Sequence, residues 1–216
     1  MKKYVNQEQI RANTKVYTNQ DQAFRALLGG IGTGNISLDA SGRLCDFEIH
    51  NHEDKKLKIP YTFFALWSRL EGEKPQALIL EAMPQGISDK ALGHPSGELI
   101  GLPRFDACRE GTNYPFYHYQ FEKGDLPLGV SMTAYTPFIP LNSKDSGIPC
   151  FQIIYRVKNN TEKPAWVSVC GTMYNDIGFL AYDGFDKLEQ KGEPFNKKVQ
   201  WGDAKGIVSG NRMNPL

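Results

Sequence analysis

The sequence predicts an all-β fold, an antiparallel β-sandwich of two sheets formed by a single domain over residues 1–216. Three observations lead to this prediction. Short segments alternate apolar and polar side chains, 21 glycines and 13 prolines separate them, and only one short helix candidate interrupts them. Several short strands with turn signals between them are typical of a sandwich or barrel rather than of βαβ units.

The first expected elements are one short helix and a pair of strands. Residues 1 to about 20 are polar and have no clear period, and residues 20–28 form the only helix candidate. Residues 43–50 alternate with period two, and residues 39–42 form the turn to a preceding strand at 35–38. The alternation sets two faces of the 43–50 strand, an apolar one of Cys45, Phe47 and Ile49 and a polar one of Asp46, Glu48 and His50.

Further strands are expected from the same signals. They lie at residues 62–70, 77–81, 117–121, 128–135, 151–158 and 167–170. The polar segment Asn159-Asn160-Thr161-Glu162-Lys163-Pro164 links the last two, and it predicts a hairpin between them.

The charge balance does not indicate nucleic acid or an anionic membrane as a partner, and it leaves only binding through a local patch open. Lys and Arg number 25 and Asp and Glu number 24, so the chain has no long-range field that would attract nucleic acid or an anionic membrane. No stretch approaches the roughly 20 apolar residues of a membrane span. Lys2 and Lys3 are not followed by the apolar run of a secretory signal. We therefore expect a cytoplasmic protein.

The four cysteines are Cys45, Cys108, Cys150 and Cys170. They are widely spaced and include no Cys-x-x-Cys pair. Three of them lie in apolar-alternating segments, and we expect all four to be reduced and buried.

The glycine-rich run Gly29-Gly30-Ile31-Gly32-Thr33-Gly34-Asn35 does not fit a nucleotide site. A dinucleotide fingerprint would need glycine at Asn35 or Ser37, and a phosphate-binding P-loop would need a lysine at its end. We expect these glycines to provide positive φ angles or close approach of another chain segment. No nucleotide or other cofactor is expected.

A metal site is conceivable at His50 and His52, which share one face of a strand with Glu48. A cupin-type site, however, places its glutamate four or five residues beyond the second histidine, where this chain has Lys56 and Leu57. We favour an exposed polar face, expect no metal, and rank a small metalloenzyme last among the hypotheses.

Catalytic residues are not assigned from the sequence. It has no G-x-S-x-G elbow, and its many carboxylates cannot be paired without a fold. The dense aromatic segment from Tyr114 to Phe121 suggests either a sugar-stacking platform or core strands, and core is favoured. A stand-alone carbohydrate-binding module that depends on Tyr117 or Tyr119 is the alternative function.

Several passages together resemble the N-terminal domain of glycoside hydrolase family 116, from about residue 27 to 178. The family includes bacterial β-glucosidases and non-lysosomal (bile-acid) glucosylceramidases. The matching blocks are residues 28–35, 42–51, 63–67, 101–105, 136–149, 157–160 and 171–175. The most telling is 136–149, Thr-Pro-Phe-Ile-Pro-Leu-Asn-Ser-Lys-Asp-Ser-Gly-Ile-Pro. Phe47 and His50 depart from the family pattern, which leaves the subfamily open.

The resemblance implies a two-domain retaining β-glucosidase in which a β-sandwich precedes an (α/α)₆ barrel that carries both catalytic carboxylates. This chain ends at Leu216, before any such barrel, so we expect it to be inactive by itself and to pack against a C-terminal catalytic domain. The family's front domain usually runs further, which leaves open an incomplete sandwich at the C-terminal end. No catalytic residue is therefore carried over. Asp145 lies in the best-matching block, but its context, Asp-Ser-Gly-Ile-Pro, is that of a turn.

Overall fold

The computed structural model describes residues 15–21, 23–49, 59, 61–83, 101–182 and 188–212. Its regular structure is almost entirely β, which confirms the predicted all-β fold with antiparallel sheets. The chain divides into two compact units, Met1–Thr172 and Met173–Leu216. The expectation that residues 1–216 form a single domain stays a prediction. In the described part of the chain, no helix has the length and apolar character that crossing a membrane requires.

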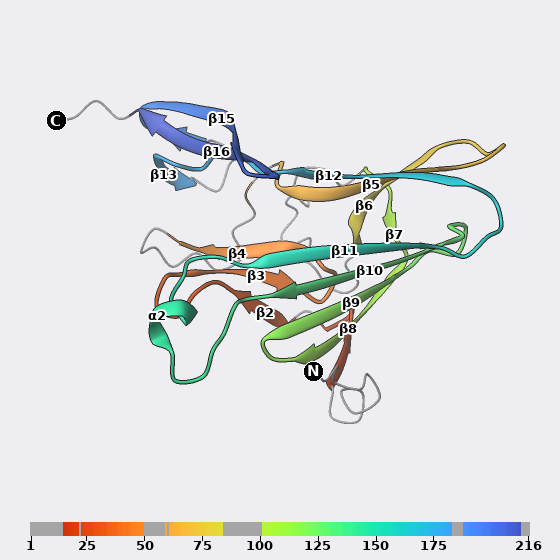
Figure 1. Cartoon of the computed structure of the whole chain (residues 1–216), viewed down its shortest axis with the longest axis horizontal. Helices are drawn as coiled ribbons and strands as arrows, with labels where there is room; N and C mark the ends of the chain where they lie inside the picture. The colour runs from red at the N-terminus through yellow and green to blue at the C-terminus, as the bar shows by residue number, and fades with distance from the viewer. Residues whose placement is uncertain are drawn as a thin grey trace. The chain divides into compact units, whose positions relative to one another are not determined.

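The largest sheet of the first unit is antiparallel and has the strand order β1-β8-β9-β10-β11 (Figure 1). Its strands are β1 (Lys15–Thr18), β8 (Ala107–Asn113), β9 (Phe116–Glu122), β10 (Leu128–Tyr135) and β11 (Gln152–Asn159). On β9 and β10 every second side chain is buried, which is the period that a sheet with one solvated face produces.

The described residues of the first unit also form two smaller sheets. One has the order β12-β5-β6-β7 and contains β12 (Ala165–Thr172), β5 (Phe63–Leu70), β6 (Gln76–Ala82) and β7 (Arg104–Phe105). Its β6–β7 pair is parallel, and its other pairs are antiparallel. The other sheet has the order β2-β3-β4 and contains β2 (Arg25–Leu28), β3 (Asn35–Asp39) and β4 (Leu44–Glu48).

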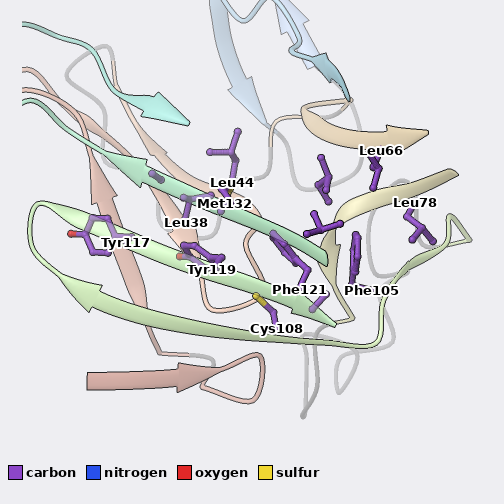
Figure 2. Packing of buried hydrophobic residues seen from close by; sticks show 14 of the residues in the cluster. Leu38, Leu44, Leu66, Leu78, Phe105, Cys108, Tyr117, Tyr119, Phe121 and Met132 are labelled. Carbon is purple, nitrogen blue, oxygen red and sulfur yellow. The ribbon is translucent and has the colours of Figure 1, made fainter. Parts of the chain in front are cut away.

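The core lies where the three sheets meet, and Figure 2 shows its side chains. Phe121 on β9 packs against Phe105 on β7, with ring centroids 5.2 Å apart. Tyr119, the largest fully buried side chain, donates from its hydroxyl to the Asp39 carbonyl at 3.1 Å. All three sheets therefore contribute side chains to one core, as the layers of a sandwich do.

The second unit contains two antiparallel pairs. Strand β13 (Phe179–Tyr182) pairs with β14 (Leu188–Gln190), and β15 (Glu193–Trp201) pairs with β16 (Ala204–Arg212). Asn175 is buried, and its amide nitrogen donates to the carbonyls of Phe195 and Gly210, one on each strand of the second pair. This side chain fixes the start of the unit to its hairpin.

The helix predicted at residues 20–28 is wrong, because residues 25–28 form strand β2. Ala26 and Leu28 are buried while Leu27 is exposed, so the period here is two, not 3.6. Pairing with β3 decides the conformation. The helix that the structure does describe is the short α2 (Ser143–Ser146), whose N-cap Asn142 accepts from the Asp145 N–H.

The hairpin predicted through residues 159–164 is also wrong. Strand β11 pairs with β10 and strand β12 pairs with β5, so this loop crosses from one sheet to another. Within the loop, the Asn159 side chain donates to the Lys163 carbonyl and accepts from the Thr161 N–H. A polar turn sequence predicts a change of direction but does not specify the partner strand.

Strand β4 contains a β-bulge that shifts the predicted alternation. Asn35 lies opposite Glu48 and Ser37 lies opposite Cys45, so two residues of β4 face one residue of β3. Asp46, at the bulge, has a φ of +49° and is buried rather than exposed. Leu44 and Phe47 therefore both join the core, which corrects the predicted apolar face of Cys45, Phe47 and Ile49.

Candidate functional site

The glycine-rich run has a structural role. The Gly29 N–H donates to the Thr136 hydroxyl at 2.8 Å, and the Ile31 N–H donates to the Ser146 carbonyl at 2.9 Å. A side-chain carbon at Gly30 would lie 2.5 Å from the Ile148 carbonyl oxygen. The expected close approach of another chain segment is confirmed, and that segment is the 136–149 block around α2.

The aromatic segment alternates about strand β9. Tyr117, Tyr119 and Phe121 point into the core (Figure 2), which confirms the core interpretation for these three residues. Tyr119 is only 1% exposed and cannot stack on a sugar, so the expectation that Tyr117 or Tyr119 would bind one is corrected. Phe116 and His118, between them in the sequence, point outward.

The cysteines are all free, but their burial differs from the prediction. Cys45 and Cys108 are buried, Cys150 is half-buried and Cys170 is exposed. Cys170 lies on β12, an edge strand with most of its side chains exposed, so the apolar sequence there did not indicate burial. Burial raises the pKa of the Cys45 thiol to about 12, and it raises the pKa of Cys108 further.

The predicted histidine pair cannot be placed, because His50 and His52 lie outside the described residues. Among the residues that are described, no three His, Cys, Asp or Glu side chains gather closely enough to hold a metal ion.

A shallow cleft of about 690 Å³ lies beside β1 and β2. The described residues that line it are Tyr17, Asp21, Ala23, Phe24, Arg25, Thr112 and Tyr117. The rings of Tyr17 and Phe24 lie 4.5 Å apart and form part of the wall. Asp21 accepts hydrogen bonds from the Thr18 N–H and hydroxyl, so this carboxylate is engaged in its own turn.

Next to this cleft lies a buried carboxyl group that sequence reasoning missed. Glu110 is fully buried, and its two carboxyl oxygens share the Thr112 hydroxyl at 2.8 and 2.9 Å. Burial raises the pKa of Glu110 to about 7, and the Thr112 hydrogen bond only partly opposes this shift. The sequence signal that could have revealed this buried group is the spacing of Glu110, which lies two residues after Cys108 and therefore on the same face of the strand.

An exposed apolar strip follows strands β12 and β5. We define the β12 apolar strip as Trp67 and Trp166 on one face of this sheet edge and Val167 and Val169 on the other, all between 39% and 47% exposed. The Arg69 guanidinium lies 4.9 Å from the centre of the Trp166 ring and covers part of it. Neighbouring exposed apolar side chains of this size are typical of a surface that another protein part covers.

Comparison with known families gives one match. The family model described as beta-glucosidase 2, glycosyl-hydrolase family 116 N-term, matches residues 26–214. No curated protein matches the chain. The matched range includes both strand pairs of the second unit and the described strands of the first unit from Ala26 in β2 onward, while β1 lies before it.

Proposed function

This chain belongs to the glycosyl-hydrolase family 116 N-terminal domain family, and we propose that it packs, as a non-catalytic β-sandwich, against a helical (α/α)₆ catalytic barrel. The enzyme as a whole would be a β-glucosidase or glucosylceramidase-like hydrolase. Membership supports the presence of a catalytic partner domain in the same protein.

The β12 apolar strip is the observation that carries the docking proposal. Trp67 and Trp166 belong to a residue type that is enriched at the energetic centre of interfaces, and Val167 and Val169 add apolar area on the opposite face of the same sheet edge. Strand β12 lies at the edge of its sheet, so a partner can reach its side chains from both sides of the strand. We propose that the catalytic barrel covers this strip.

The buried carboxyl group supports a non-catalytic role. A retaining glycosidase needs two carboxyl groups about 5–5.5 Å apart on either side of the sugar bond. Glu110 has a pKa suited to a general acid, but its side chain is fully buried and cannot reach a glycosidic bond. Burial excludes only Glu110 itself. From the match to the family's N-terminal domain, we propose that both catalytic carboxylates lie on the partner domain and that this chain alone does not hydrolyse glucosides.

A cytoplasmic location is part of the proposal. All four cysteines are free, as expected in a reducing compartment. Fractionation of source cells, with antibody detection of the chain, would test it, and recovery with secreted proteins would contradict it.

The experiment compares this chain with its reading frame extended past Leu216 in the source DNA, using an aryl β-glucoside as substrate. We expect a helical continuation and hydrolysis only by the longer protein. In that longer protein, Val169→Lys should place a charge in the proposed interface, weaken docking of the two domains and lower the melting temperature of the enzyme. The matched control is Ile154→Lys, an equally exposed strand residue on another sheet. Equal effects of the two substitutions would contradict docking at the β12 strip.

A further inference from the structure

The outer face of the five-stranded sheet has an aromatic patch that the core does not use. We define the aromatic patch as Phe116 and His118 on β9 and Tyr135 on β10. The Phe116 and His118 rings are nearly parallel, with an angle of 6° and centroids 6.4 Å apart. Tyr135 lies directly across the strand pair from Phe116, with centroids 5.1 Å apart. The three rings therefore form a continuous surface around Phe116.

Phe116 is 41% exposed at the centre of this patch. The neighbouring residue Tyr117 packs in the core, and Phe116 lies on the opposite face of the same strand. A large exposed ring at a position that does not fill the core is a poor stabiliser of the fold and a common feature of binding surfaces.

The polar groups around the patch are neutral hydrogen-bonding groups. The Tyr135 hydroxyl donates to Gln152 Oε1 at 2.5 Å, so the amide group of the exposed Gln152 keeps its two hydrogens for other acceptors. His118 Nδ1 lies 3.0 Å from the Thr133 hydroxyl. Desolvation lowers the pKa of His118, so its ring is uncharged at neutral pH. The patch thus combines flat rings with uncharged donors and acceptors.

We propose that the aromatic patch binds the pyranose ring of a neutral carbohydrate. The C–H face of a pyranose carries a partial positive charge that matches the negative face of an aromatic ring. The hydroxyl groups at the edge of the sugar match Gln152 and Thr133. Phosphate ligands and nucleic acid are disfavoured, because these residues offer no cation to pair with a phosphate. The site lies on the outer face of one sheet, whereas the β12 apolar strip lies on another.

Saturation-transfer NMR on the 216-residue chain tests the proposal, with methyl β-D-glucopyranoside and cellobiose as probes. Sorbitol is the ligand control, because it has sugar hydroxyls but no ring face. We expect transfer to both glucosides and none to sorbitol. Phe116→Leu keeps the apolar contact but removes the flat ring, and it should weaken binding about tenfold. Tyr135→Ala should weaken it similarly, while Trp201→Leu, at an exposed ring on β15, should leave binding unchanged.

Three results would overturn the proposal. The first is the absence of transfer to either glucoside. The second is equal transfer to sorbitol or to adenosine, which would indicate nonspecific adhesion or base stacking. The third is wild-type affinity in Phe116→Leu, with circular dichroism confirming that the variant is folded. Because none of these measurements requires the catalytic domain, their failure leaves the docking proposal standing, and failure of docking leaves this one standing.

Discussion

Arg25 and Asp46 form an ion pair across the three-stranded sheet, with 2.7 Å between Arg25 Nε and Asp46 Oδ2. Arg25 lies on β2 and Asp46 on β4, and β3 separates these two strands. The pair therefore joins the two outer strands over the middle one. Since Asp46 lies at the β-bulge, the ion pair also holds the bulge in its register.

Replacing Asp46 by asparagine should lower the free energy of unfolding by about 1–3 kcal/mol, because the Arg25 guanidinium loses its charged partner. Asparagine tolerates the positive φ at this position, so the loss reports the ion pair and not backbone strain. Urea denaturation measures the change. Asp46→Ala should cost roughly a further 1 kcal/mol, since alanine tolerates positive φ poorly. Unchanged stability in Asp46→Asn would show that the pair contributes nothing.

Gly30→Ala should destabilise the protein by about 1–3 kcal/mol or more, because the added methyl group meets the Ile148 carbonyl oxygen at 2.5 Å. This contact is with backbone, which cannot move aside as a flexible side chain can. Thermal unfolding followed by circular dichroism would measure it. Gly124→Ala is the control, since its added carbon has nothing within 4 Å, and its melting temperature should stay near wild type. A similar small effect at both positions would contradict the tight junction at Gly30.

Glu110 should make the first unit less stable as pH rises from about 4.5 to about 7. Its pKa is raised from 4.5 to about 7 by burial, so the folded state holds a proton that the unfolded state has already released. Stability is therefore greatest below the unfolded pKa and falls through this window, with a slope approaching about 1.4 kcal/mol per pH unit for one proton. Glu110→Gln should remove this part of the pH dependence. Urea titrations of the wild type and of Glu110→Gln at pH 4.5, 6 and 8 measure the free energy of unfolding. The same pH dependence in both proteins would show that Glu110 is not responsible.

The cysteines should react with a thiol reagent in an order set by burial. At pH 8, Cys170 should react first in the native protein, because it is exposed on an edge strand. Cys45 and Cys108 should react only after unfolding, because they are buried and their raised pKa values leave almost no thiolate. Mass spectrometry of labelled peptides measures the order, with Cys170→Ser as the control. Early labelling of Cys108 would contradict its placement in the core.

The sequence predicted strands well where the burial pattern is local. The expected strand at residues 128–135 has the same bounds as β10, and its inward and outward side chains alternate as expected. Strand partners were harder, because the turn after Asn159 looks the same whether the next strand pairs with β11 or crosses to another sheet. Pairing is a long-range property that a polar loop does not encode.

Three features were missed for different physical reasons. Strand β8 was not expected, because its sequence is polar and Glu110 is buried within it. The bulge at Asp46 adds one residue to the register, and a period-two pattern cannot reveal this. Phe116 and His118 of the aromatic patch were included in one dense segment with Tyr117 and Tyr119, since the phase of the alternation depends on which sheet face is covered.

The strand order β12-β5-β6-β7 also sets the time at which the fold can be completed. Leu70 pairs with Ala165, so β5 receives its second neighbour only after most of the first unit has been synthesised. Contacts between residues so distant in sequence slow folding, because a large loop must close before they form. On the ribosome, β5 will therefore leave the exit tunnel with one edge unpaired, and the nascent chain must keep that edge from pairing with other chains until β12 follows.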